Sequence, residues 1–274
     1  MCYNPLERKK YTIIKNTMLQ PSIYEMQIQA PEIAQLAKPG QFVNLYCKDQ
    51  SKLLPRPISI CEVDKQAGWV RLIYAVVGSG TRLFSHMSEG ETIDVLGPLG
   101  HGFSLEDAWE AKEEAAKILI VGGGVGTPPL LELAKTLKRN YQDKVDLTII
   151  LGFRDDVYLA QEFSAYGKVY VSTDSGREGY HGHVVGLLEA QELEQKDIAF
   201  DYIYACGPTR MLRGLQSFGL RQNNQGEFSL EERMGCGFGG CVGCVVAIKQ
   251  DEDFEYMKVC KDGPIFDYRK VIFS

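Results

Sequence analysis

Residues 118–130 read Ile-Leu-Ile-Val-Gly-Gly-Gly-Val-Gly-Thr-Pro-Pro-Leu, an apolar run of strand length that stops at a cluster of glycines. After the glycines, Thr127 is a candidate N-cap for a helix with Pro128 and Pro129 in its first turn. Strand, glycine turn and helix in this order favour a nucleotide, because the bare backbone approaches a pyrophosphate and the helix N-terminus favours its charge. The candidate binding residues are Gly122, Gly123, Gly124 and Gly126. A plain strand-to-helix turn is the alternative, since Pro129 occupies the place of the third glycine of the motif.

The same alternation continues downstream of the glycine turn. Further strands are expected at 145–151, 169–171 and 202–205, and further helices at 159–166, 184–188 and 209–218. Alternating strands and helices predict a doubly wound parallel sheet, whose ligands bind at the carboxyl ends of the strands.

A second candidate element, Cys206-Gly207-Pro208, follows the strand expected at 202–205. Its position at a carboxyl end favours a place beside a bound ligand, although Cys206 fits a buried core thiol equally well. Asp174 follows the strand at 169–171 and is a candidate for a ribose hydroxyl or a turn residue.

Upstream of residue 103, short apolar runs alternate with turn residues and predict a small antiparallel β-barrel. The expected strands lie at 11–14, 24–28, 42–46, 58–60, 70–74 and 92–96.

The barrel segment also carries candidate cofactor contacts. In Arg56-Pro57-Ile58-Ser59, the guanidinium suits a phosphate and the hydroxyl suits a ring heteroatom, with a surface Arg at a strand entry as the alternative. Further along, Ile73-Tyr74-Ala75 supplies an aromatic ring, which is otherwise simply a strand residue. Gly80-Thr81 follows as a glycine turn with a hydroxyl suited to phosphate.

Four cysteines near the C-terminus stand in the order C-x4-C-x2-C, followed after 15 residues by a fourth: Cys236, Cys241, Cys244 and Cys260. This is the plant-ferredoxin spacing for a 2Fe-2S cluster. A four-cysteine zinc site is the alternative, but such sites usually use two C-x2-C pairs. A chain of 274 residues does not need a disulfide framework, so the remaining cysteines are interpreted as reduced thiols.

Composition narrows the class of protein. A hydrophobic content of 45% and a charged content of 24% are those of a globular protein, and the net charge of -6 argues against a nucleic-acid partner. The N-terminus lacks a secretory apolar region, and no apolar run approaches the roughly 20 residues of a membrane span. A cytoplasmic, non-membrane protein is therefore expected, with domains at 1–103, 104–225 and 226–274.

These segments together, with Gly97-Pro98-Leu99-Gly100, resemble the ferredoxin reductase superfamily. With the cluster motif appended, the chain looks like the electron-transfer subunits of class 1B dihydroorotate dehydrogenases. The resemblance covers essentially the full length. It implies a barrel that holds FAD, a parallel sheet that holds NAD and a C-terminal 2Fe-2S module.

The resemblance also implies roles for individual residues. FAD would be held by Arg56, Pro57, Ile58 and Ser59, by Ile73, Tyr74 and Ala75, and by Gly80 and Thr81. Ser59 would bond the flavin near its hydride-transferring nitrogen, and Cys206, with Gly207 and Pro208, would line the nicotinamide pocket. The cluster would lie on Cys236, Cys241, Cys244 and Cys260.

The partner implied by the resemblance is an FMN-containing catalytic subunit that oxidises dihydroorotate in pyrimidine biosynthesis, in a heterotetramer with two of each chain. Electrons would pass from that FMN through the cluster and FAD to NAD. The alternative is a homologous subunit of an NADH-dependent ferredoxin:NADP oxidoreductase, a sulfide dehydrogenase or a hydrogenase. The choice of NAD over NADP also rests on the resemblance.

We expect Cys206→Ser to keep the full iron content, because Cys206 lies outside the four-cysteine motif, whereas Cys244→Ser should lose iron. Iron analysis and the visible spectrum of both purified variants test this. Loss of iron in Cys206→Ser would mean that the fourth ligand is Cys206 and not Cys260.

Overall fold

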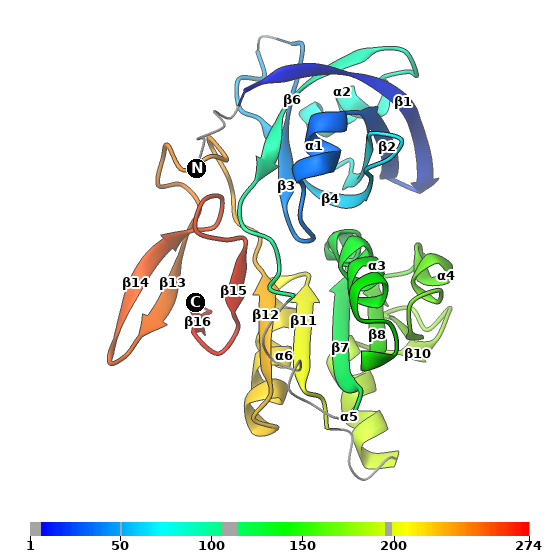
Figure 1. Cartoon of the computed structure of the whole chain (residues 1–274), viewed down its shortest axis with the longest axis vertical. Helices are drawn as coiled ribbons and strands as arrows, with labels where there is room; N and C mark the ends of the chain where they lie inside the picture. Colours follow the sequence, from blue (N-terminus) through cyan, green and yellow to red (C-terminus); the bar gives the residue numbers. More distant parts are fainter. Residues whose placement is uncertain (1–6, 50, 106–113, 195–198, 274) are drawn as a thin grey trace.

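The computed structural model describes residues 7–49, 51–105, 114–194 and 199–273. A β-barrel, a mostly parallel sheet and a smaller C-terminal sheet lie against one another (Figure 1). None of the helices in these ranges is long and apolar enough to cross a membrane.

The barrel is closed by six antiparallel strands in the order β1-β2-β5-β4-β3-β6, which confirms the predicted fold of this part. Its strands are β1 (Lys9–Gln20), β2 (Ile23–Gln29), β3 (Phe42–Tyr46), β4 (Arg56–Asp64), β5 (Trp69–Ala75) and β6 (Thr92–Leu99). Two short helices, α1 (Pro31–Leu36) and α2 (Ser79–Ser85), accompany them. Closure leaves no free sheet edge, and alternate residues of each strand fill the interior.

The second sheet has the order β10-β9-β8-β7-β11-β12-β15, and all its pairs are parallel except that of β15. Its strands are β7 (Ala116–Gly123), β8 (Val145–Phe153), β9 (Lys168–Thr173), β10 (Tyr180–His181), β11 (Tyr202–Cys206), β12 (Gln225–Ser229) and β15 (Ile265–Asp267). The helices are α3 (Pro129–Tyr141), α4 (Ala160–Phe163), α5 (Val184–Glu194) and α6 (Thr209–Arg221). Residues of α3 and α4 pack in one hydrophobic cluster and residues of α5 and α6 in another. The sheet is therefore doubly wound, as predicted.

The order in which strands are added to this sheet changes side at β7. The chain first places β8, β9 and β10 on one side of β7 and then places β11 and β12 on the other. β7 is paired with β8 on one side and with β11 on the other, and Gly122 is opposite Cys206 in the β7–β11 register. Such a reversal opens a crevice at the carboxyl ends of the two strands. The glycine turn and the Cys206-Gly207-Pro208 segment therefore lie side by side.

The prediction that Thr127 caps the following helix is wrong. Gly124–Gly126 form a 3₁₀ turn, and α3 begins at Pro129 with Pro128 at the N-cap position. The hydroxyl of Thr127 is buried and has no hydrogen-bond partner among the described residues. The glycines continue the turn for longer than the sequence motif suggested, so Thr127 ends the 3₁₀ turn and does not start the helix.

The C-terminal part forms a three-stranded antiparallel sheet from β13 (Val245–Gln250), β14 (Asp253–Lys258) and β16 (Val271–Ile272). The segment 230–244, which carries three of the motif cysteines, leads into it from β12. Since β12 and β15 both belong to the larger sheet, the cysteine loop is held between two strands of that sheet.

Charged side chains join the barrel to the domain formed by the seven-stranded sheet and its helices, called here the nucleotide-type domain. Arg71 on β5, only 9% exposed, bonds Glu25 in the barrel at 2.8 Å and Glu162 on α4 at 2.5 Å. On α3, Lys135 bonds Glu62 at 2.7 Å, and Glu132 accepts a hydrogen bond from the Val63 N–H at 3.1 Å. The barrel is thus fixed against α3 and α4 by directional contacts as well as by apolar packing.

We expect Arg71→Ala to lower the free energy of unfolding by about 3 kcal/mol, because it removes the guanidinium that pairs at 2.8 Å with the buried carboxylate of Glu25. Arg269→Ala, which breaks an exposed pair with Asp267, should cost less than about 1 kcal/mol and serves as the control. Urea unfolding followed by circular dichroism measures both.

The loss of unfolding free energy in Arg71→Ala should depend on pH. Burial raises the pKa of Glu25, but Lys15 and Arg71 outweigh burial and hold that pKa below its ordinary 4.5. A lowered carboxyl pKa stabilises the folded state above pH 4.5, and this contribution is lost as the pH falls through the folded-state value. A deficit that stays constant from pH 7 into this acid range would contradict the role given to Glu25.

Candidate functional site

The crevice at the carboxyl ends of β7 and β11 is lined by backbone in close contact. A Cβ on Gly126 would lie 2.5 Å from backbone atoms of Cys206 and Gly207, and one on Gly123 would lie 2.9 Å from Pro208. Gly124 has a φ of +52°, which favours glycine. The structure therefore brings together the glycine turn and the Cys206-Gly207-Pro208 segment, which the sequence named separately.

Two residues missed by the sequence analysis, Tyr158 and Glu231, border the same crevice. The Tyr158 hydroxyl donates to the Gly124 carbonyl at 2.7 Å. Burial raises the pKa of Cys206, and the nearby Glu231 carboxylate raises it further, so the thiol is neutral. The crevice around Glu231 also raises its pKa by desolvation, although the residue is exposed at the surface. Neither residue belongs to a recognisable spacing pattern, so no signal in the sequence pointed to them.

The outer face of β4 is turned toward the nucleotide-type domain. Cys61 on β4 and Ile73 on β5 pack in the hydrophobic cluster that contains α3 and β7, whereas Ile58 and Ile60 pack in the barrel interior. Because strand residues alternate between faces, Ser59 shares the outer face with Cys61. The Ser59 side chain is half-buried. It therefore lies on the barrel face that meets the nucleotide-type domain, whose β7 and β11 form the crevice.

Tyr74 lies on the opposite face. Its ring is 2% exposed, packs in the barrel interior near Tyr24 and Phe84, and directs its hydroxyl to Asn16 at 3.2 Å. Any contact of Tyr74 with a cofactor outside the barrel would therefore be through its backbone. The strand pattern alone does not reveal this, because it does not say which face is interior.

Arg56, Gly80 and Thr81 gather at the N-terminal end of α2. The Arg56 guanidinium lies over Gly80, where a Cβ would collide with it, and its Nη1 donates to the Leu54 carbonyl. The Thr81 hydroxyl accepts hydrogen bonds from the N–H groups of Val77 and Gly78. Beside them, a surface cavity of about 540 Å³ is lined by Asp49, Lys52, Gly78, Ser79, Arg82, Leu83 and His86. The basic side chains here suit an anionic group.

The four motif cysteines come together as two pairs. Backbone N–H groups of Cys241 and Gly239 donate to the sulfurs of Cys236 and Cys260, at 3.3 and 3.1 Å. Cys244 is close enough to Cys260 to share a hydrogen bond with it, and the thiol of Cys236 contacts that of Cys241. All seven cysteines among the described residues are free thiols.

The pairs suit two irons better than one. No group of three or more His, Cys, Asp or Glu side chains closes around a single ion in the described part of the chain. Burial opposes ionisation of Cys236, but N–H groups of the loop outweigh it and lower its pKa to about 6. Burial and the adjacent Cys244 raise the pKa of Cys260 to about 12. Two cysteines per iron, with sulfur atoms that accept backbone N–H bonds, would fit a 2Fe-2S cluster bound by Cys236, Cys241, Cys244 and Cys260.

Asn44 on β3 connects the barrel to the cysteine loop. It is fully buried, and its Nδ2 donates to the Cys236 carbonyl at 2.9 Å. Gly237, with a φ of +75°, lies against the Asn44 amide so closely that a Cβ would collide with it. Since β3 pairs with β4, this contact places the loop one strand away from Ser59.

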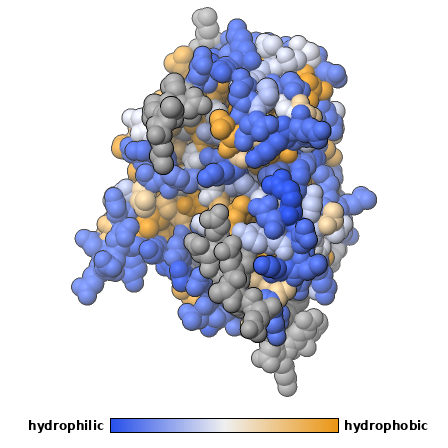
Figure 2. Space-filling model, in the orientation of Figure 1, coloured by the Kyte–Doolittle hydropathy of each residue, from blue (hydrophilic) through white to orange (hydrophobic). Residues whose placement is uncertain are grey.

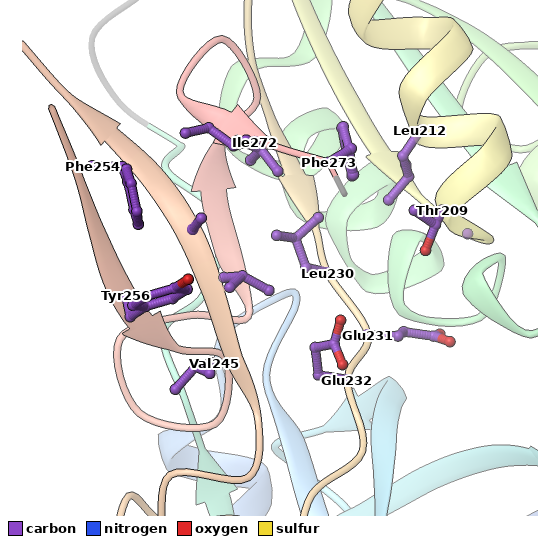
Figure 3. Close-up of a pocket in the computed structure, with 14 residues that line it drawn as sticks. Thr209, Leu212, Leu230, Glu231, Glu232, Val245, Phe254, Tyr256, Ile272 and Phe273 are labelled. Atoms are coloured by element: carbon purple, nitrogen blue, oxygen red, sulfur yellow. The ribbon is translucent and has the colours of Figure 1, made fainter. Parts of the chain in front are cut away.

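A cavity of about 490 Å³ lies between the nucleotide-type domain and the C-terminal sheet. Gly207 and Thr209 line one side, and mainly apolar residues of β13, β14 and β16 line the other, including Val245, Phe254, Tyr256 and Ile272. In Figure 3, Phe254 and Tyr256 lie across the cavity from Thr209 and Leu212. Apolar side chains gather beside the β13–β14 hairpin in the space-filling view (Figure 2).

Comparisons with known proteins define the class. The iron-sulfur cluster binding domain of dihydroorotate dehydrogenase B matches residues 231–272, and the oxidoreductase NAD-binding domain matches residues 120–217. The structure of an NADH-dependent reduced ferredoxin-NADP oxidoreductase is similar with a TM-score of 0.81 and 27% identity, over 99% of this chain and 91% of that one. A ferredoxin NADP+ reductase from Neisseria gonorrhoeae shares the fold, with a TM-score of 0.65 and 18% identity over 78% and 91% of the two chains. The chain is an oxidoreductase of the ferredoxin reductase type with an added iron-sulfur domain.

Curated relatives narrow this class to one family. The electron transfer subunit of dihydroorotate dehydrogenase B (NAD(+)) from Geobacillus thermodenitrificans is 39% identical over 97% of this chain and 98% of its own length. The corresponding subunit from Streptococcus mutans is 38% identical over 97% and 99%. The chain belongs to the family of dihydroorotate dehydrogenase B electron transfer subunits, which confirms the resemblance seen in the sequence.

We expect Asn44→Ala to loosen the cysteine loop, because it removes the hydrogen bond to Cys236 and opens a cavity under Gly237. Iron should be released faster during incubation with a chelator, by about fivefold, while FAD content is unchanged. Asn16→Ala, an amide deletion elsewhere in the barrel, is the control. Equal iron release from the Asn44 variant and the wild type would show that the loop does not depend on this bond.

Proposed function

We propose that this chain is the electron-transfer subunit of a dihydroorotate dehydrogenase B, passing electrons from the FMN of a catalytic subunit through a 2Fe-2S cluster and FAD to NAD. The observation that carries the proposal is the meeting of three candidate sites around β3 and β4. The outer face of β4 packs against the nucleotide-type domain, and Asn44 on β3 donates a hydrogen bond to the cysteine loop. When bound, a flavin between these sites exchanges single electrons with a cluster and a hydride with nicotinamide.

The FAD site is proposed on the outer face of the barrel. Arg56, with Gly80 and Thr81 at the end of α2, would bind the pyrophosphate, because guanidinium pairs well with phosphate oxygens. Ser59 would donate its hydroxyl to the flavin ring on the face that meets the nucleotide-type domain. Pro57 and Ile58 would shape the same strand, and Ile73, Tyr74 and Ala75 would contribute mainly backbone.

The NAD site is proposed in the crevice between β7 and β11. Gly122, Gly123, Gly124 and Gly126 let a pyrophosphate approach the turn before α3. Gly207 and Pro208 would form the opposite wall. The neutral thiol of Cys206 would line the nicotinamide pocket without carrying a charge that competes with the cofactor.

The domain limits proposed are 1–103 for FAD, 104–225 for NAD and 226–274 for the cluster. The partner is proposed to be an FMN-containing catalytic subunit in a heterotetramer of two of each chain. The relatives are named as electron transfer subunits, which supports the presence of a partner subunit. A cytoplasmic location is proposed, and the free thiols among the described residues support it.

The test is an anaerobic reaction of the chain purified with its native partners. We expect dihydroorotate to bleach the flavin and cluster absorbance, and added NAD to restore it while NADH forms. A complex with Cys244→Ser should lose this transfer yet still accept electrons from NADH at its flavin. A cofactor-loaded complex that NADH reduces but dihydroorotate never reduces would instead favour a ferredoxin, sulfide or hydrogen oxidoreductase.

A further inference from the structure

The segment from residue 157 to 163, called here the bridging segment, contacts both domains of the candidate site. It follows β8 and includes α4. Its first part touches the glycine turn through Tyr158, and both its ends touch the barrel. The candidate binding residues named from the sequence do not include it, and the proposed electron path does not use it.

Tyr158 controls one carbonyl of the glycine turn. The Gly124 oxygen accepts the Tyr158 hydroxyl at 2.7 Å and the Thr127 N–H at 3.1 Å. A carbonyl oxygen that already accepts two hydrogen bonds is not free to face a phosphate, whose negative charge it would repel. The Tyr158 ring is itself held against Phe153 at the end of β8, with ring centroids 4.9 Å apart.

The backbone of the bridging segment is arranged for this contact at a cost. Leu159 has a φ of +66°, a left-handed conformation that is unfavourable for a residue with a Cβ. The side chain of Leu159 is buried in the core that contains α3. The reversal at Leu159 lets this side chain enter the core while the preceding Tyr158 reaches the glycine turn. Strain of this kind persists only where the surroundings fix it.

The barrel holds the bridging segment from the other side. Gln20 Nε2 on β1 donates to the Val157 carbonyl at 3.1 Å. Arg71 on β5 bonds both oxygens of Glu162, at 2.5 and 3.1 Å. Arg71 is nearly buried, whereas Glu162 is 44% exposed, so this bond is directional but open to solvent. The residues on either side of Tyr158 are therefore fixed to the barrel.

We propose that Tyr158 is a positioning residue for the pyridine nucleotide: it holds the Gly124 carbonyl away from the pyrophosphate, and the barrel holds Tyr158 in place. The inference rests on the proposed function, because it requires that the glycine turn binds NAD. It predicts that nucleotide binding depends on the contacts of the barrel with the bridging segment. It also predicts that Tyr158 acts on binding and not on the transfer step.

The test compares Tyr158→Phe with Tyr166→Phe in the cofactor-loaded complex. Both variants remove one hydroxyl near α4, but the Tyr158 hydroxyl bonds the glycine turn, whereas Tyr166 lies near Lys135 on α3. We expect Tyr158→Phe to raise the KM for NADH in an artificial-acceptor assay, and the Kd of NAD in calorimetry, by about five- to tenfold. The kcat, FAD content and cluster spectrum should match the wild type, as should every value of Tyr166→Phe.

The possible failures separate the two ideas. A wild-type complex that does not bind NAD overturns the proposed function. Normal NAD binding by Tyr158→Phe overturns the positioning role alone, and so does a loss of FAD or a fall in kcat at unchanged KM. Glu162→Gln should raise the KM less than Tyr158→Phe does and should lose its effect at high salt. An unchanged KM at low salt overturns the link to the barrel.

Discussion

The packing of the barrel against α3 and α4 is the constraint on which the rest of the structure depends. Arg71 is at its centre, joined to Glu25 on the adjacent barrel strand β2 and to Glu162 on the other domain. Removing a guanidinium from water is unfavourable unless carboxylates surround it, so this side chain is stable in one relative placement of the domains. That placement turns the outer face of β4 toward the crevice between β7 and β11. A shift of the barrel would move the outer face of β4 away from α3 and break the contacts of the bridging segment with the barrel.

The cysteine loop is attached to the same frame by different means. It leaves β12 of the large sheet, and the chain returns to that sheet at β15. Between these anchors, Asn44 of the barrel reaches the carbonyl of Cys236 through contact with a bare glycine. The loop therefore takes its position from both domains and not from the small C-terminal sheet alone.

Much of the fold followed from local patterns. Apolar runs and turn residues predicted six barrel strands, all of which the structure contains, and alternation predicted the doubly wound sheet. The cap at Thr127 was wrong because the glycines prolong a 3₁₀ turn, which a motif does not reveal. Tyr74 was expected beside a cofactor, but its ring fills the barrel interior, since an aromatic strand residue fits either face. Tyr158 and Glu231 were missed because their importance comes from neighbours distant in the sequence.

The sequence by itself determined the fold class, the family and the chemistry of the ligand groups, because glycine freedom, strand periodicity and thiol spacing are local properties. Only the tertiary structure decided which of these groups meet. The pairing of Cys236 with Cys241 and of Cys244 with Cys260, the contact of Asn44 with the cysteine loop and the hold of Tyr158 on Gly124 all join separate elements. Such contacts arise from the packing of buried surfaces and from the need to satisfy buried polar groups, and neither is written in the spacing of a motif.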